Sequence, residues 1–210
     1  MKCFTALLLL VASTLQAAPI DELTLAAGND NVRAMTSLLV RGVDPNGRDL
    51  RGRSALESAL RESSGRALEA LLGLAVLDVD SANAAGETPL MLAALLGQID
   101  AVKKLAARGA QINKPGWTPL HYACSGPDEG VIAWLLAHGA DINARSPNGS
   151  TPLMMAVRYG AMDSAGLLLS GGADVNLRNE QGLQALDFAR AAGREVWVNT
   201  LTPLTTRATR

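Results

Sequence analysis

The chain has 210 residues, of which 48% are apolar but only 3% aromatic, and its formal net charge is −1. This length suits a single elongated domain. The nearly balanced charge gives no indication of a surface for nucleic acid. The abundance of small aliphatic residues is typical of helices that pack closely together.

Residues 1–17 have the pattern of a secretory signal peptide. Lys2 gives a positive start, the stretch from Ala6 to Ala12 is apolar, and small and polar residues lead to Ala17. The apolar stretch is too short to cross a bilayer. We therefore expect cleavage after Ala17 and export to the periplasm as a soluble protein without a membrane span.

A short motif then recurs at intervals of 34, 30, 33 and 33 residues. Its full form, Gly-Xaa-Thr-Pro-Leu, begins at Gly86, Gly116 and Gly149, and degraded copies begin at Gly52 and Gly182. The threonine hydroxyl can accept a hydrogen bond from the first helical turn, and proline at the first helical position loses no bond. Each copy therefore predicts the start of a helix.

A second motif, Gly-Ala-Asp-Ile-Asn or a close variant, follows at Gly42, Gly109, Gly139 and Gly172. Together with Thr118-Pro119-Leu120-His121 it resembles the ankyrin repeat, which has a period of 33 residues. The resemblance implies an all-α solenoid, with two helices in each repeat and a β-hairpin-like finger between repeats. It also implies that the protein binds other proteins and has no fixed catalytic residues.

The motifs divide a domain of residues 18–204 into six repeats, near 21–46, 47–80, 81–113, 114–143, 144–176 and 177–204. The second repeat has one extra residue, which we expect in Glu62–Gly65. The finger after the third repeat is three residues short and closes with the turn dipeptide Pro115-Gly116. The last helix is expected to end at Pro203, which leaves residues 205–210 as a loose tail.

His121 and Cys124 lie three residues apart on one expected helix, so they share a face. One interpretation is a thiolate–imidazole pair in a thiol enzyme. The other is packing, with His121 as a hydrogen-bonding brace to the neighbouring finger and Cys124 as a small buried residue. No metal-ligand spacing, phosphate loop or nucleophile motif accompanies the pair. We therefore expect a protein that is not an enzyme and has no metal or cofactor.

The apolar run of the fourth repeat predicts its core. Trp134 stands at an aliphatic core position and Leu136 lies in the same run, so we expect both to be buried and truncation of Leu136 to be costly.

Partner-binding candidates come from the inner helices and the fingers. In the ankyrin family the fourth residue of each first helix tends to face a concave groove, although packing between repeats would explain the apolar ones equally well. Tyrosine suits an interface because it combines an apolar ring with a polar tip. The groove candidates are Trp117, Tyr122, Met155, Arg158 and Tyr159. The finger candidates are Arg48, Arg51 and Arg53, which are either simply solvated or face an acidic partner.

The sequence thus predicts a monomeric, exported interaction module that binds another protein through its groove and fingers. One alternative is an inhibitor or immunity protein that blocks an exported enzyme or toxin. The other alternative is the thiol enzyme that uses Cys124.

Overall fold

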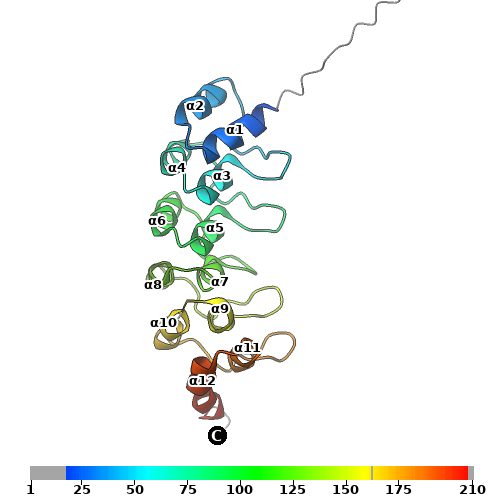
Figure 1. Cartoon of the computed structure of the whole chain (residues 1–210), viewed down its shortest axis with the longest axis vertical. Coiled ribbons are helices and arrows are strands. Elements are labelled where there is room, and N and C mark those ends of the chain that lie inside the picture. The colour runs from blue at the N-terminus through cyan, green and yellow to red at the C-terminus, as the bar shows by residue number, and fades with distance from the viewer. Residues whose placement is uncertain (1–17, 162, 208–210) are drawn as a thin grey trace, which may run out of the picture.

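The computed structural model describes residues 18–161 and 163–207, which form twelve α-helices stacked in six antiparallel pairs (Figure 1). The first helices of the pairs are α1 (Pro19–Gly28), α3 (Ala55–Arg61), α5 (Pro89–Leu95), α7 (Pro119–Ala123), α9 (Pro152–Tyr159) and α11 (Ala185–Ala191). The second helices are α2 (Val32–Val40), α4 (Gly65–Leu72), α6 (Ile99–Ala107), α8 (Glu129–Ala137), α10 (Ser164–Ser170) and α12 (Glu195–Arg207). The predicted all-α solenoid is confirmed. The predicted signal peptide lies outside the described residues.

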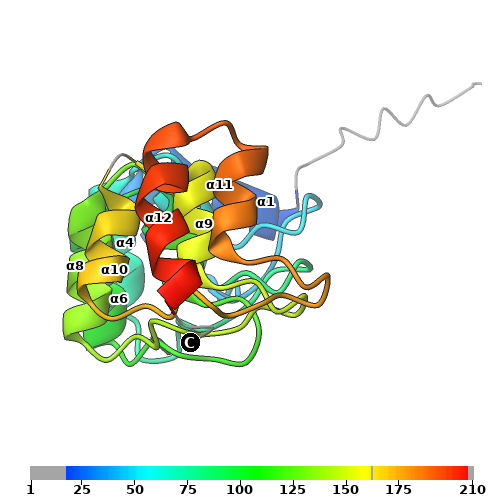
Figure 2. The same ribbon diagram turned by 90° about the horizontal axis from the view of Figure 1, so that it is seen from below.

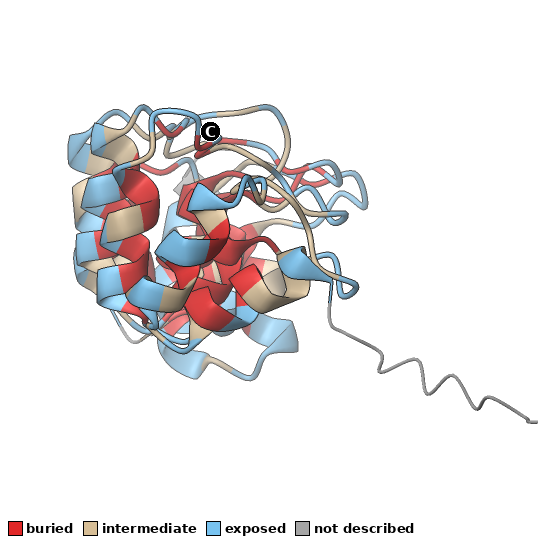
Figure 3. Ribbon diagram, turned by 90° about the horizontal axis from the view of Figure 1, so that it is seen from above, coloured by how far each residue is buried: buried red, intermediate tan, exposed pale blue. Residues whose placement is uncertain are grey.

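Seen along the stack, the second helices form one layer and the first helices the next, and the fingers project on the side of the first helices (Figure 2). We call the surface formed by the fingers and the first helices the inner face. Figure 3 shows that buried positions gather where the two layers meet. Each repeat therefore buries its apolar residues against its neighbours, as expected for a solenoid.

The helix starts form as the sequence predicts. The hydroxyl of Ser54 accepts a hydrogen bond from the backbone N–H of Glu57 at 3.1 Å, and the Thr88 hydroxyl accepts one from Met91 at 3.3 Å. The proline after each threonine occupies the first helical position. These caps fix where α3, α5 and α9 begin, and therefore which of their residues face inward.

The fingers are tight hairpins with little strand structure. In the second repeat the backbone N–H of Asp49 donates to Arg53 at 2.9 Å, and the sixth repeat has the equivalent bond from Asn179 to Leu183 at 3.0 Å. Gly52 and Gly182 take positive φ values of 75° and 76° at these tips, which glycine adopts without strain. The finger before α7 is visibly shorter than the others (Figure 1).

The extra residue of the second repeat is not where we expected it. The capping residues of its two helices, Ser54 and Ser64, have the same separation as those of the third repeat. An added turn follows α4 instead, closed by a bond from the backbone N–H of Leu77 to the carbonyl of Leu74. The prediction for Glu62–Gly65 is therefore wrong, because a surface loop accepts an insertion more easily than a packed inter-helix turn.

The last helix does not end at Pro203 but runs through it to Arg207. Trp197 and Leu201 are buried and hold α12 against the preceding repeat. Thr205 also donates its hydroxyl to the carbonyl of Leu201 at 3.2 Å. Burial on one face thus carries the helix past a residue that would end an isolated one.

In the fourth repeat the core residue is Leu135 rather than Leu136. Leu135 is fully buried, whereas Leu136 is only half-buried. Trp134 is also half-buried, and its ring stacks on His138 with the centroids 3.7 Å apart. We expected Trp134 and Leu136 to be buried, but the buried residue is Leu135, between them. The expectation was wrong because α8 is apolar nearly all round, so its pattern sets no clear inward face.

Candidate binding face

Two rows of residues run along the inner face because the first helices stack in register. The row four positions after each helix cap contains Ser58, Leu92, Tyr122, Met155 and Phe188. The row seven positions after each cap contains Arg61, Leu95, Ser125, Arg158 and Ala191. Both rows follow from the caps at Ser54, Thr88, Thr118, Thr151 and Gln184. Equivalent positions in neighbouring repeats are therefore adjacent in space.

The first row changes character along the stack. Ser58 and Leu92 are buried, so they pack between repeats. Tyr122, Met155 and Phe188 are half-buried and leave part of each side chain accessible. The accessible part of the row therefore lies in the fourth to sixth repeats.

A pocket of about 190 Å³ opens in this region. Its walls come from three adjacent repeats and from the base of the short finger. The lining residues are Leu95, Trp117, His121, Tyr122, Ser125 and Met155. The structure thus brings together three of the groove candidates, Trp117, Tyr122 and Met155.

The aromatic wall of the pocket is held in place by its neighbours. The Trp117 ring packs edge-on against His121 and Tyr122, with centroid separations of 5.2 and 6.4 Å. The Tyr122 hydroxyl donates a hydrogen bond to Glu87 at 3.0 Å. Burial and the neighbouring Glu87 carboxylate raise the pKa of Tyr122 to about 12, so it stays protonated. These contacts hold Trp117 and Tyr122 in the wall of the pocket.

Arg158 and Tyr159 follow Met155 on α9 but do not line the pocket. Tyr159 is 54% exposed. The guanidinium of Arg158 lies 5.0 Å from the centre of the Tyr159 ring and 5.8 Å from that of Phe188. Arg158 has no ion pair among the described residues. Its charge is therefore available to a partner.

The three finger arginines differ from one another. Arg48 forms an ion pair with the buried Glu57 at 2.7 Å and also donates to the carbonyl of Ala82 at 2.8 Å. Arg53 pairs with Asp49 at 3.3 Å. Arg51 is exposed. Arg48 and Arg53 thus brace the fingers, and only Arg51 remains a free binding candidate.

His121 is a brace between repeats. The backbone N–H of Thr118 donates to Nδ1 at 3.2 Å, so Nδ1 carries no proton, and Nε2 then donates to the carbonyl of Ser150 at 3.0 Å. Both ring nitrogens are occupied, and neither contacts the Cys124 thiol. Cys124 is fully buried, and burial raises the pKa of its thiol well above the ordinary range. The geometry therefore supports packing rather than a thiolate–imidazole pair.

The buried imidazole predicts a pH dependence of stability. Burial lowers the pKa of His121 below its ordinary value of 6.5, against a smaller opposite effect of the Ser150 bond. As the pH falls below about 6.5, the unfolded chain takes up a proton that the folded chain resists, so the free energy of unfolding decreases.

Denaturant unfolding between about pH 7.5 and about pH 5.5 tests this prediction. His121→Gln should remove most of the slope in this window. His138→Gln is the matched control, because His138 is the second of the two histidines in the chain and is exposed. Equal slopes for wild type and His121→Gln would contradict the assignment.

The sequence did not single out Leu95 and Ser125 as members of one site. The signal was present, since both stand seven positions after a helix cap. Their common pocket became visible only once the repeats were stacked. Among the described residues no cluster of side chains could hold a metal ion, and no helix there is long and apolar enough to cross a membrane.

The sequence profile of a known family matches most of this stack. The family is described as Ankyrin repeats (3 copies), and its matches cover residues 23–115, 63–146, 112–179 and 128–203. The chain belongs to the ankyrin-repeat family. The resemblance stated from the sequence is therefore confirmed. Ankyrin repeats bind other proteins, and the family is generally non-enzymatic.

Individual relatives extend the comparison. The chain is 32% identical to the B-cell lymphoma 3 protein homolog of Mus musculus over 159 residues, which are 72% of this chain and 35% of that protein. It is 29% identical to the tyrosine-protein kinase Shark of Drosophila melanogaster over 173 residues, which are 80% of this chain and 18% of the kinase. The ankyrin-repeat chain thus spans about a third or less of these curated relatives.

One chain of a solved structure matches this protein over nearly the whole length of that chain. One chain in the complex of the Bd0816 predatory endopeptidase from Bdellovibrio bacteriovorus with the immunity protein Bd3460 superposes with a TM-score of 0.71 at 25% identity. The match covers 86% of this chain and 95% of that chain.

Proposed function

We propose that this ankyrin-repeat protein is an exported interaction module that binds another protein on its inner face. The observation that carries the proposal is the apolar pocket lined by Trp117, Tyr122 and Met155, with the exposed Arg158 and Tyr159 on the same helix as Met155. Aromatic residues, methionine and arginine are enriched at the centres of protein interfaces. Export is proposed from the signal-peptide pattern of residues 1–17, and the compartment is the periplasm.

An inhibitor or immunity protein is the more specific form of this function. It is favoured by the solved complex of an endopeptidase with an immunity protein, since one chain of that complex has the same stacked architecture over nearly all its length. In this form the inner face covers an exported enzyme and keeps it inactive. The module acts by occupying a surface, and needs no catalytic group of its own.

One experiment tests export and binding together. The full chain carries a C-terminal tag in its native host, and mass spectrometry identifies both its N-terminus and the proteins that copurify from the periplasm. We expect an N-terminus at Ala18 or within a residue or two, and a specific partner. Recovery of intact Met1 would reject export.

The copurified partner then allows the inner face to be tested. Tyr159→Ala should weaken its affinity by about 1–3 kcal/mol, as for an interface hot spot, without a change in melting temperature, because Tyr159 is mostly exposed. Val40→Ala, on α2 and 83% exposed, is the control away from the inner face. Unchanged affinity for Tyr159→Ala would place the partner on another surface. If the partner is an enzyme, loss of its activity at a one-to-one ratio supports the inhibitor form.

A further inference from the structure

The size and lining of the pocket on the inner face limit which side chains can enter it. Most of its lining side chains are apolar, and Ser125 and His121 are the polar exceptions. An apolar cavity of about 150 Å³ is large enough to hold benzene. The space of about 190 Å³ therefore has room for one large apolar side chain, aliphatic or aromatic.

The pocket lies at the base of the short finger, which carries Trp117. Between Asn113 and Thr118 the chain is three residues shorter than in the equivalent fingers. Trp117, the residue directly before the Thr118 cap, packs on His121 and Tyr122. Gly126 adds to the close packing of this region, since a side chain there would approach the carbonyl of Leu95 to 2.7 Å.

The charges around the pocket are asymmetric. At the finger end, Glu87 accepts hydrogen bonds from Tyr122 at 3.0 Å and from the Asn83 amide at 2.8 Å. At the other end lies Arg158. It belongs to the same row as Leu95 and Ser125, seven positions after a helix cap, and stands one repeat beyond Ser125. Its guanidinium lies over two aromatic rings and has no carboxylate partner among the described residues. A carboxylate is thus favoured beside Arg158 and disfavoured beside Glu87.

We infer that the pocket anchors a segment of a partner protein that carries a large apolar side chain with a carboxylate about three residues away. This inference deepens the proposed function and depends on it. Neighbouring first helices lie about 8–10 Å apart, and an extended chain covers about 3.3–3.6 Å per residue. The apolar side chain enters between Trp117 and Met155, and the carboxylate then reaches Arg158.

A phage-displayed library of random 12-residue peptides, selected on the full chain, tests the inference without the native partner. The selected peptides should share a large apolar residue with Asp or Glu about three positions away. A synthetic peptide of that pattern should lose at least tenfold in affinity for Ser125→Trp, which fills the pocket, and about tenfold for Arg158→Glu. The same peptide with Lys in place of its acidic residue should bind Arg158→Glu more tightly than it binds wild type.

Arg61→Glu is the matched control for the charge, because Arg61 holds the same position in the second repeat, with Glu62 beside it. Its affinity for the peptide should remain within twofold of wild type. Melting curves establish that the variants fold, and Leu95→Lys replaces Ser125→Trp if the latter does not. The inference is overturned if no peptide is selected, if the selected peptides lack a carboxylate, or if they bind the filled pocket as well as they bind wild type. A copurified partner combined with any of these results rejects the pocket and leaves the proposed function standing.

Discussion

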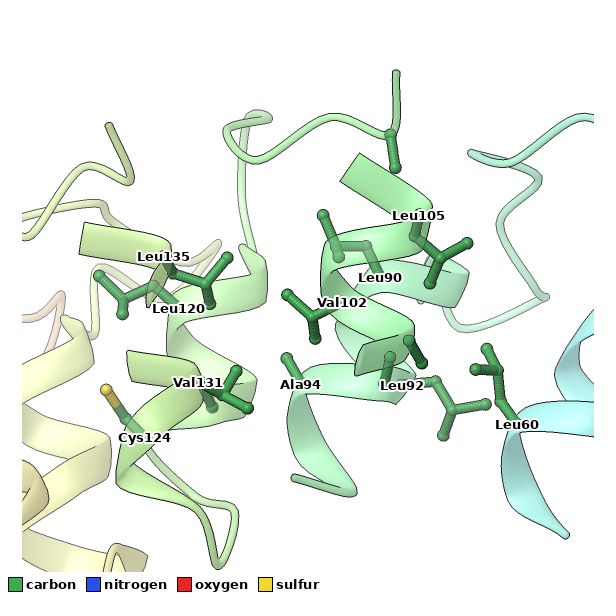
Figure 4. Packing of buried hydrophobic residues seen from close by; sticks show 14 of the residues in the cluster. Leu60, Leu90, Leu92, Ala94, Val102, Leu105, Leu120, Cys124, Val131 and Leu135 are labelled. Carbon is green, nitrogen blue, oxygen red and sulfur yellow. The ribbon is translucent and has the colours of Figure 1, made fainter. Parts of the chain in front are cut away.

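Leu135→Ala should lower the free energy of unfolding by about 2–5 kcal/mol, because the substitution removes a fully buried side chain and leaves a cavity. Leu135 lies in α8 and projects into the same part of the core as Leu120 (Figure 4). Because each repeat is stabilised mainly by its neighbours, the loss should affect the central repeats together. Denaturant unfolding followed by circular dichroism measures it.

Leu136→Ala is the control for this prediction. Leu136 is adjacent in sequence but only half-buried, so its truncation should cost about 1 kcal/mol. If Leu136→Ala proved the more damaging of the two, the inward face of α8 would be the one expected from the sequence.

Arg48→Ala should destabilise the protein by about 3 kcal/mol, although Arg48 lies on a finger. It is 26% exposed, whereas its partner Glu57 is only 4% exposed. Removal of the arginine leaves a buried carboxylate without its ion pair, which is strongly destabilising. It also removes the bonds to the carbonyls of Ser81 and Ala82, which tie this finger to the next one.

A double-mutant cycle separates the ion pair from the other bonds of Arg48. Glu57→Gln removes the buried charge, so Arg48→Ala should cost less in that background than in wild type. Arg51→Ala, on the same finger and exposed, should change stability by less than about 0.5 kcal/mol. If Arg48→Ala behaved like Arg51→Ala, Arg48 would return to the set of binding candidates.

The helix starts show how much of the fold is local. A threonine that bonds the first turn and a proline that needs no bond there specify a start from adjacent residues alone. The glycines at the finger tips are equally local, since the positive φ of about 75° at these positions strongly favours glycine. The family resemblance rests on these same motifs, and it supplied the solenoid architecture and the expected binding activity.

The errors came where tertiary packing overrides a local signal. Pro203 would end an isolated helix, but burial of Trp197 and Leu201 carries α12 beyond it. In α8 the apolar residues run nearly all round the helix, so only its neighbours decide that Leu135 faces inward. From the sequence, Arg48 was one of three equivalent finger arginines, and only the fold shows that it pairs with the buried Glu57.

The candidate site divides in the same way. The sequence alone determined the residue types and their register, because repeats of near-constant length return Tyr122, Met155 and Phe188 to equivalent places on successive helices. Only the tertiary structure decided which of them are accessible, since exposure depends on how closely the neighbouring repeat approaches. The pocket exists because a short finger, three stacked helices and the ring of Trp117 meet there. No single repeat contains enough of its wall to specify it.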